Sequence, residues 1–546
     1  MPSLLPVLTI ILPLLGAGGI LGLSLVPRAR ALTRYIALIA ACLTTILLLT
    51  FTSVEPVTTV VISLWQPSLL FGAALALRPD VIMQPLALVL ALITCSAILV
   101  GLGRAEEPHP RLVATLLALL SAGLAALWAA NLLTMIVIWA IYDLLHAAGR
   151  VAAGGSGRTA VRSLILGYLA TLALWSGILL ANGGAGSELW SLVALSGAPL
   201  TLWVVAGLLR LWVYPLHLSI PDDLGAAQSL AAPLLLGPVI GWGLWLRLVQ
   251  ANGGSIPGNT WVTIVAAVTL AVGGFLAWSC ESPRRMLPWI GMGVSGAVLL
   301  TAGLAGDSAI TVIAADSVAW ALGLAVLLLS DGLQREALWW NIPPLVGALA
   351  LMGVVLTLGF VADEILIGDL TKGGSPGWGG AFFVGYLFLV PSLVRWLLLR
   401  PSSPFPRKEG GWGIRSVARG VGLGVPALLL ILATLPPSLL TKDFPVPSLS
   451  PLFATPGLTG WLLLAVSLAG GGVLAWQERN LRPKIQLFLS AAHDLLRLEW
   501  LYDAVAGALD RGLSMLRAAG EVVGGAGALL WSWLLFFLLL LVWGGR

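Results

Sequence analysis

The sequence predicts an all-α fold, a polytopic bundle of membrane-spanning helices. Of the 546 residues, 59% are hydrophobic and only 10% are charged, and the mean hydropathy is +0.99. So few charges do not cover the surface of a water-soluble globule, and so apolar a chain is not intrinsically disordered. The apolar runs are continuous and about twenty residues long, the length that crosses a bilayer as a helix. A membrane β-barrel would instead show segments of about ten residues with alternating polarity.

We expect about sixteen transmembrane helices, two of which are broken by proline. Pro215 interrupts the seventh span, and Pro233 and Pro238 weaken the eighth. The expected spans are residues 4–25, 31–51, 80–103, 111–128, 130–149, 161–182, 197–218, 230–250, 259–280, 285–306, 308–330, 341–362, 379–400, 418–440, 456–476 and 528–544. The first segment lacks a basic region and a small-residue cleavage site, so we interpret it as a retained helix and not a signal peptide.

Basic residues alternate from loop to loop, which predicts the orientation of the bundle. Arginines follow most odd-numbered spans, as Arg28 and Arg34 do after the first, whereas loops after even-numbered spans hold few bases, such as Arg78 and Lys372. Because basic loops favour the cytoplasmic side, the N-terminus is expected outside. We expect an integral protein of the plasma membrane or another energy-transducing membrane.

Residues 477–527 depart from this pattern because charged residues recur among apolar ones at helical spacing. Leu495, Leu498, Leu501 and Tyr502 fall on one side of the expected helix. This pattern predicts a long lateral amphipathic helix on the cytoplasmic side. At about 40 residues it would be about 60 Å long, so we favour a brace against neighbouring subunits over a surface helix with no other role. The expected parts are a transmembrane bundle (1–476), this lateral helix (477–527) and an anchoring transmembrane helix (528–546).

Cysteine and histidine usage argues against a bound cofactor. Cys42, Cys95 and Cys280 form no CxxC pair, and the four histidines are scattered. We therefore expect no structural disulfide, metal site or iron–sulfur cluster. No phosphate-binding loop or convincing dinucleotide-binding motif is present, and the net charge of +5 comes from short loops, so no nucleic-acid partner is expected.

The fifth span carries three ionisable residues on one helical face. Asp143, His146 and Arg150 are spaced by three and four residues, which brings their side chains together. Asp and His titrate, so the cluster is a candidate part of a proton path. The alternative, which spacing alone favours slightly, is a local ion pair that neutralises Asp143 within the helix.

Other ionisable residues occur in later spans. Arg210 lies in the seventh span and His217 follows its proline, and broken helices at membrane depth are typical of transport sites. Asp316 lies in the eleventh span, and Asp363 and Glu364 end the twelfth. A single aspartate such as Asp316 is also commonly hydrogen-bonded between helices. None of the four lysines lies in a span, although buried lysine is a residue that can carry a proton.

Several stretches resemble the antiporter-like membrane subunits of respiratory complex I, a family shared with multisubunit sodium/proton antiporters and membrane-bound hydrogenases. The most specific is RLWVYPLH at 210–217, followed by SIPD at 219–222. NLLTMIVIW at 131–139, ESPRRML at 281–287, NIPPL at 341–345 and GFVADE at 359–364 are similar to further family segments. Sixteen spans, a lateral helix and LEWLYD at 498–503 resemble the distal, largest subunit of this type.

The resemblance implies a proton path through ionisable residues near the bilayer centre, and this chain departs from it. The family's fifth-span glutamate falls on Ala140, its seventh-span lysine on Arg210 and its eleventh-span lysine near Leu324. The histidine expected in the eighth span is missing near Pro233. A carboxylate stands at the twelfth-span position, at Asp363 or Glu364, and Asp143, one turn from Ala140, is a candidate to replace the missing glutamate.

The resemblance implies a membrane-arm subunit of a complex I-type NADH (or ferredoxin):quinone oxidoreductase that contributes to proton translocation by a modified path. The proton-path candidates are Asp143, His146, Arg210, His217, Asp316, Asp363 and Glu364. The expected partners are other membrane subunits, the bilayer and protons, with Na⁺ as an alternative ion. The chain is not expected to be a redox catalyst. Two alternatives remain open: a non-conducting structural subunit, and a membrane partner of an ion-coupled carrier, such as a Na⁺/H⁺ antiporter or an inorganic-carbon uptake system.

Overall fold

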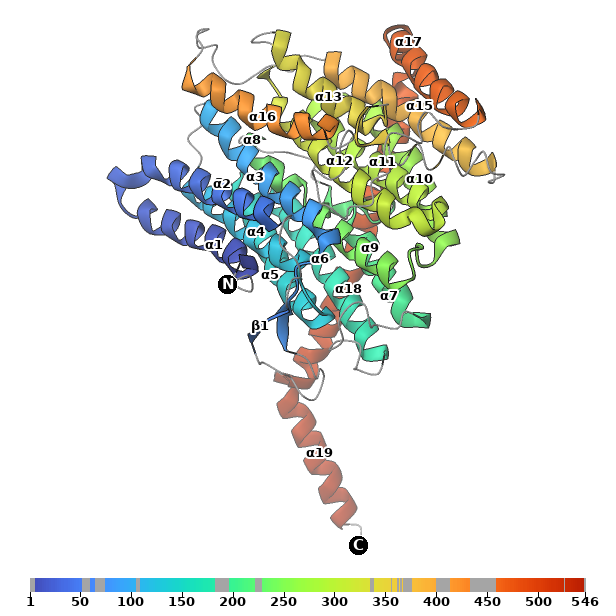
Figure 1. Ribbon diagram of the computed structural model, residues 1–546. Helices are drawn as coiled ribbons and strands as arrows, with labels where there is room; N and C mark the ends of the chain where they lie inside the picture. The colour runs from blue at the N-terminus through green and yellow to red at the C-terminus, as the bar shows by residue number, and fades with distance from the viewer. Residues whose placement is uncertain are drawn as a thin grey trace. The chain divides into compact units, whose positions relative to one another are not determined.

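The part of the chain that the structure describes is helical apart from one pair of short strands and the connecting segments (Figure 1). The computed structural model describes residues 5–51, 59–63, 74–104, 109–181, 196–220, 228–333, 338–354, 356–360, 363, 366, 376–398, 413–432, 458–524 and 526–544. Glu364 and the SIPD motif beyond residue 220 lie outside the described residues. The chain divides into two compact units, Met1–Pro483 and Lys484–Arg546.

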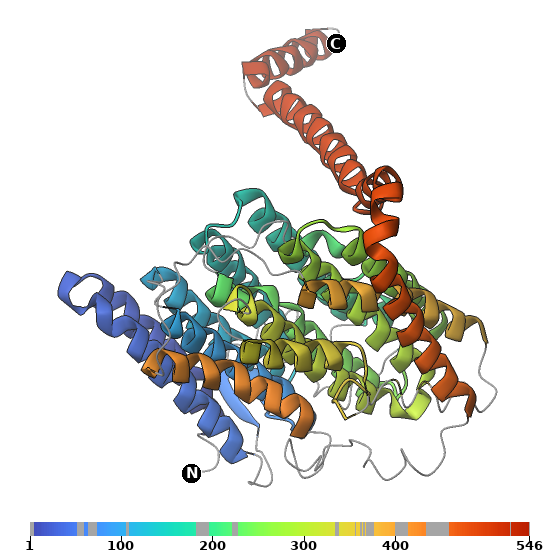
Figure 2. The same cartoon turned by 90° about the horizontal axis from the view of Figure 1, so that it is seen from above.

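The first helices follow the expected spans closely. They are α1 (Leu5–Ser24), α2 (Thr33–Phe51), α3 (Gln84–Gly103), α4 (Pro110–Leu127), α5 (Leu132–Ala152) and α6 (Gly157–Leu180). The short 3₁₀ helix η2 (Pro27–Leu32) joins α1 to α2, which lie side by side at one edge of the bundle (Figures 1 and 2). A second 3₁₀ turn, η3 (Val81–Met83), leads into α3.

The later helices of the first unit also occupy the expected spans. They are α9 (Pro238–Ala251), α10 (Asn259–Ser279), α11 (Pro283–Leu304), α12 (Ala309–Ser330), α15 (Pro376–Leu398) and α16 (Ile414–Leu432), with 3₁₀ turns η7 (Gly306–Ser308) and η9 (Leu338–Asn341). α12 is buried along its whole length and packs against α3, α9, α11 and α13 (Ile342–Leu351). It therefore forms the centre of the unit.

Helix breaks occur at the two expected places and at a third. α7 (Gly197–Arg210) ends five residues before Pro215, and η6 (His217–Ser219) follows it. α8 (Gln228–Leu235) is separated from α9 ahead of Pro238. We expected a continuous twelfth span over 341–362, and this expectation is wrong because α13 ends at Leu351. Gly353 and Leu356 have φ of +64° and +72°, which a helix does not accommodate.

Twelve helices among the described residues are long and apolar enough to cross a membrane. α7, the η9–α13 stretch and Leu530–Leu539 are shorter apolar helices. This arrangement confirms a polytopic membrane bundle, while the count of sixteen spans stays a prediction.

Two short strands precede α3, which the sequence analysis did not anticipate. β1 (Val60–Ser63) and β2 (Leu75–Leu77) pair antiparallel, with Val60 opposite Leu77 and an irregularity between Val61 and Ser63. Leu77 also forms a bridge to Ala129 after α4. The strands thus tie the segment before α3 to the end of α4.

Arginine side chains hold the C-terminal ends of several helices. The last carbonyls of a helix have no partner within it and carry the negative end of its dipole, which favours a cation. The pairs are Arg104 with Leu329 O (2.5 Å) and Asp331 O (2.7 Å) after α12, Arg419 with Gly103 O (2.8 Å) at α3, Arg247 with Leu127 O (2.5 Å) at α4, and Arg482 with Ser279 O (2.8 Å) at α10. Some of the basic residues that predicted orientation therefore also have a packing role.

The C-terminal helices differ from the expected boundaries of the lateral helix. α17 (Leu458–Leu496) continues from the expected fifteenth span past residue 476, and α18 (Glu499–Gly524) follows a turn at Leu498, whose φ is +56°. α19 (Ala526–Gly544) ends the described chain. α18 exposes Leu501, Val505, Leu509 and Leu513, which recur every four residues. The amphipathic stretch is thus divided, because a left-handed residue ends an α-helix.

Candidate functional site

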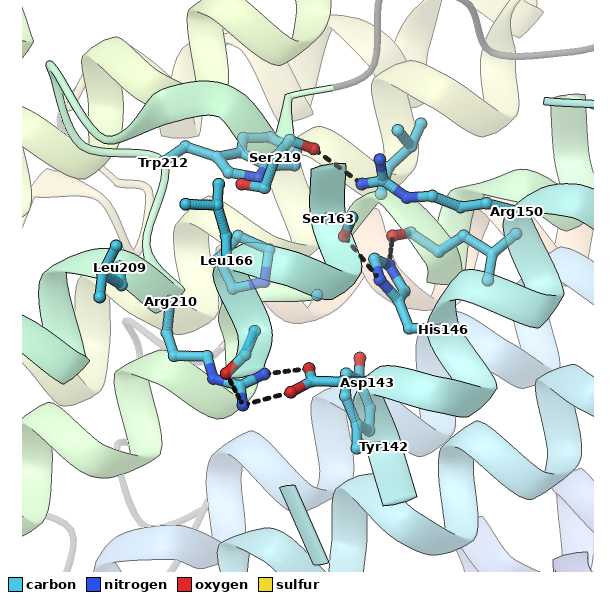
Figure 3. A pocket seen from close by; sticks show the side chains of 15 residues that line it. Tyr142, Asp143, His146, Arg150, Ser163, Leu166, Leu209, Arg210, Trp212 and Ser219 are labelled. Atoms are coloured by element: carbon cyan, nitrogen blue, oxygen red, sulfur yellow. Dashed lines mark hydrogen bonds and ion pairs between the residues drawn. The ribbon is translucent and has the colours of Figure 1, made fainter. Parts of the chain in front are cut away.

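A polar cavity lies where the fifth, sixth and seventh spans meet the break between α8 and α9. Its volume is about 40 Å³, and a single water needs about 10–15 Å³. Asp143, His146 and Arg150 line it from α5, Ser163 and Gly167 from α6, Arg210 from α7, and Trp212 and Ser219 from the segment beyond the α7 break. Figure 3 shows Arg210 extending to Asp143, with His146 and Arg150 on the other side of the cavity. The cavity has room for a few waters among titratable groups.

Asp143 and Arg210 form a buried ion pair across α5 and α7. Both oxygens of the carboxylate accept hydrogen bonds: Arg210 Nη1 donates to Oδ1, and Nη2 donates to Oδ2 at 2.7 Å. Arg210 Nη2 also donates to Gly167 O and Thr171 Oγ1, each at 3.2 Å. Such bidentate charge-assisted pairs are strong and fix geometry, and burial makes their disruption costly.

Trp139 completes the support of the guanidinium. The Arg210 Cζ atom lies 4.0 Å from the centroid of the Trp139 ring, a cation–π contact. Trp139 and Asp143 are four residues apart on α5, so one helical face supplies both the ring and the carboxylate. Gly167 is required opposite, because a Cβ there would occupy the position of the Asp143 carboxylate.

The break between α8 and α9 provides a partner for His146. Pro238 has no N–H, so the carbonyl of Leu234, four residues earlier, lacks its helical donor. His146 Nε2 lies 2.5 Å from this oxygen. Because a carbonyl only accepts, Nε2 carries the hydrogen, and Nδ1 lies 3.3 Å from Ser163 Oγ. The broken helix therefore sets the tautomer of a buried histidine beside the ion pair.

Arg150 adds a second positive charge to the cavity. Its Nη2 donates to Ser219 O at 2.9 Å, and its Nη1 reaches no acceptor among the described residues. The alternative expected an ion pair that neutralises Asp143, and the structure has one, but its partner is Arg210 of α7 and not a residue of the same helix. The spacing argument is right that Asp143, His146 and Arg150 share a buried face.

A second, smaller polar cavity lies at the α13 break. It has a volume of about 20 Å³ and is lined by Asp316 and Trp320 of α12, Thr301 of α11, Asp363 and Tyr386. Tyr386 Oη donates to Asp363 Oδ1 at 3.3 Å. Gly353, at positive φ, lies so close to Asp363 that a Cβ would collide with its carboxylate. Each cavity is thus found at a broken helix.

The structure separates the remaining candidate, His217, from both cavities. Its ring stacks on Tyr214 at 5.4 Å between centroids and meets Trp289 edge to face at 5.5 Å. The sequence did not indicate Tyr386, Thr301 and Trp139 as site residues, because uncharged side chains do not stand out in apolar membrane spans as ionisable ones do. Within the described ranges, no group of three or more His, Cys, Asp or Glu side chains is placed to hold a metal ion. The three cysteines are free, with Cys42 Sγ and Cys95 Sγ 3.3 Å apart.

Comparisons with known proteins give distant relatives. No family model matches the chain. NADH-quinone oxidoreductase subunit N from Mycobacterium sp. (strain JLS) is 26% identical over 295 residues, covering 48% of this chain and 61% of that protein. NAD(P)H-quinone oxidoreductase chain 4 2 from Microcystis aeruginosa is 28% identical over 255 residues, covering 43% and 45%. The chain therefore matches less than two thirds of the length of these curated relatives.

Solved structures share the fold over most of the chain. A chain of the Mrp complex from Dietzia sp. DQ12-45-1b has a TM-score of 0.76 at 18% identity, covering 98% of this chain and 63% of that one. A chain of the membrane-bound sulfane sulfur reductase, an archaeal respiratory membrane complex, has a TM-score of 0.72 at 18% identity, covering 98% and 99%. A chain of respiratory complex I from Thermus thermophilus gives 0.58 at 17%, covering 79% and 99%. The resemblance to antiporter-like membrane subunits is confirmed, and the distal type stays a prediction.

Proposed function

We propose that this antiporter-like chain is a membrane-arm subunit of a complex I-type NADH (or ferredoxin):quinone oxidoreductase and contributes to redox-coupled proton translocation by a modified path. The observation that carries the proposal is the buried Asp143–Arg210 pair in a cavity with room for water, next to two helix breaks. Electron transfer would belong to partner subunits. The relatives in quinone oxidoreductases support this choice of complex.

In this proposal the two charges have different tasks. Arginine stays protonated, so Arg210 is a fixed positive charge and does not itself carry a proton. Asp143 titrates, and a proton that binds it from the cavity cancels its attraction for Arg210. His146, three residues on and in the same cavity, offers a neighbouring site through Nδ1. The ion pair therefore separates when a proton binds Asp143 and forms again when the proton leaves.

A non-conducting structural subunit is the second candidate. The observation that favours it is the number of donors on the Asp143 carboxylate, which Arg210 contacts through both of its terminal nitrogens. A bidentate pair of this kind is a strong link between two helices. In that case the pair would only fasten α5 to α7, and proton pumping would not depend on its titration.

The experiment compares Asp143→Asn with the native complex in sealed proteoliposomes. We expect protons pumped per electron to fall while electron transfer through the complex continues. Asp307→Asn is the matched control, because Asp307 is exposed at η7 and lines neither cavity. Unchanged pumping by a correctly assembled Asp143→Asn complex would favour the structural candidate and contradict conduction.

A third candidate is a membrane partner of an ion-coupled carrier. The observation that favours it is the similarity of fold to a chain of the Mrp complex, over 98% of this chain. Native purification followed by mass spectrometry of the associated chains discriminates between the assemblies. Quinone-reductase or hydrogenase subunits would support the main proposal. A carrier or a non-redox partner, with activity that depends on Na⁺, would replace it.

Orientation and the role of the amphipathic helix belong to the same proposal. The alternation of basic loops supports an N-terminus outside the plasma or another energy-transducing membrane. α18, with its exposed apolar face, would then serve as a brace on neighbouring subunits, and α19 as an anchor. Cross-linking from cysteines introduced at Val505 and Leu509 to partner subunits tests the brace, and cross-links to lipid alone would contradict it.

A further inference from the structure

The two polar cavities are separated by a pair of tryptophans. Trp212 lines the first cavity, which holds the Asp143–Arg210 pair, and Trp320 lines the second, which holds Asp316 and Asp363. The two rings meet edge to face, with centroids 5.6 Å apart. Both side chains are buried, with exposed fractions of 3% and 0%. The two packed indoles therefore lie in contact with each other, one in the lining of each cavity.

Indoles in contact do not pass a proton. The indole Nε1–H donates a hydrogen bond and has no acceptor site, so it neither receives a proton nor completes a relay. Rings packed at this distance also exclude the water that would bridge two hydrated cavities, and apolar constrictions block conduction by staying dry. The pair thus interrupts any proton path that joins Asp143 to Asp316.

The two rings are held differently. Trp320 lies four residues after Asp316 on α12, and its Nε1 donates to Gly291 O of α11 at 2.8 Å. Trp212 lies on the non-helical segment after the α7 break, where Val213 N donates to Leu211 O across it in a tight turn. The backbone at Trp212 is therefore not held by the hydrogen bonds of a helix, whereas Trp320 is fixed between two buried helices.

The Trp212 ring is close in sequence to the charge of Arg210. Arg210 is the last residue of α7, and Trp212 is two residues further on. When Asp143 loses its charge, Arg210 loses its strongest contact, and the segment that follows it is released from α5. A displacement of Arg210 is thus transmitted to Trp212 through one intervening residue.

We propose that Trp212 and Trp320 form a barrier to protons between the two water-holding cavities. In this barrier the Trp212 ring moves, and the Trp320 ring against which it packs stays in place. This inference rests on the proposed proton path for its purpose. The seal itself depends only on the positions of the two cavities and the contact between the rings. The inference gives a role in controlling proton passage to two tryptophans, which do not titrate themselves.

The test measures passive proton leak of the intact complex in proteoliposomes, without redox substrate. We expect Trp212→Ala to raise the decay rate of an imposed pH gradient at least about tenfold, and Trp212→Phe to raise it less. Trp242→Ala is the matched control, because this fully buried tryptophan of α9 lines neither cavity. Added indole, which refills a cavity left by the missing ring, should reduce the leak of Trp212→Ala only.

The outcomes separate this inference from the proposed function. The double variant Trp212→Ala/Asp143→Asn should lose the leak, because the leak runs through the first cavity. An assembled Trp212→Ala complex that leaks no more than Trp242→Ala would overturn the barrier. A leak that persists in the double variant would show that protons pass the first cavity without Asp143, and would count against the proposed function instead. Proton pumping that depends on Asp143 would leave the proposed function in place in either case.

Discussion

Breaking the Asp143–Arg210 pair should lower the free energy of unfolding, and the two single substitutions should lower it by different amounts. Two opposite charges about 4 Å apart attract by about 4 kcal/mol at an effective dielectric constant of about 20. Asp143→Asn leaves Arg210 charged and buried without its counter-charge, which typically costs about 3–5 kcal/mol. Arg210→Gln should cost less, because the remaining carboxyl neutralises itself by binding a proton, whereas a guanidinium has no such route.

The double variant Asp143→Asn/Arg210→Gln should be less destabilised than the sum of the single variants by about 2–4 kcal/mol. Pulse proteolysis of the detergent-solubilised complex measures the free energy of unfolding of each variant. The partly exposed pair of Arg497 with Glu499, whose closest atoms are 2.6 Å apart, is the control, with an expected coupling of about 0–1 kcal/mol. A coupling at Asp143 and Arg210 no larger than that of the control would refute the buried pair.

Three further predictions concern the residues that shape the two cavities. Trp139→Leu removes the ring that contacts Arg210 and should lower the free energy of unfolding by about 0.5–2 kcal/mol. Pulse proteolysis measures this change, and an unchanged free energy of unfolding would contradict the cation–π contact. Gly167→Ala places a methyl where the carboxylate lies and should cost about 1–3 kcal/mol, with assembly of the complex on native gels as the readout; a fully assembled, unchanged variant would argue against the close approach. Gly353→Ala should be more harmful than Gly167→Ala, since it adds backbone strain at positive φ to the collision with Asp363, and equal thermal midpoints for the two variants would contradict this order.

The spans were predictable from the sequence because length and hydropathy suffice for helices in a bilayer. α3, α10 and α12 agree with the expected ranges to within a few residues. The α7 break was also predictable, because proline removes a backbone donor wherever it falls. The α13 break was not, because glycines such as Gly353 are common in membrane helices and do not by themselves mark a break.

The strand pair before α3 was missed for a related reason. Residues 57–63 read VTTVVIS, a β-branched run that favours a strand, but no neighbouring alternation singled it out. The lateral helix was expected to begin at residue 477, where charges begin, whereas α17 continues to Leu496 because charge alone does not end a helix. The division falls at Leu498 instead.

The sequence was sufficient to predict which residues belong to the site, but not which of them contact one another. Helical spacing correctly placed Asp143 and His146 on one face. It had no information on Arg210, which is 67 residues further along and reaches the same carboxylate through folding. The partner of His146 depends on the proline that frees the carbonyl of Leu234, a link that only the packed structure reveals.

Infrared difference spectroscopy detects whether the Asp143 carboxyl group binds and releases a proton during turnover. Spectra of the reconstituted complex are recorded with and without redox substrate, for the native chain and for Asp143→Asn. We expect a carbonyl band of a protonated carboxyl group that appears during turnover in the native complex and is missing in the variant. Identical difference spectra for the two complexes would show that Asp143 stays paired with Arg210, and would contradict conduction through this cavity.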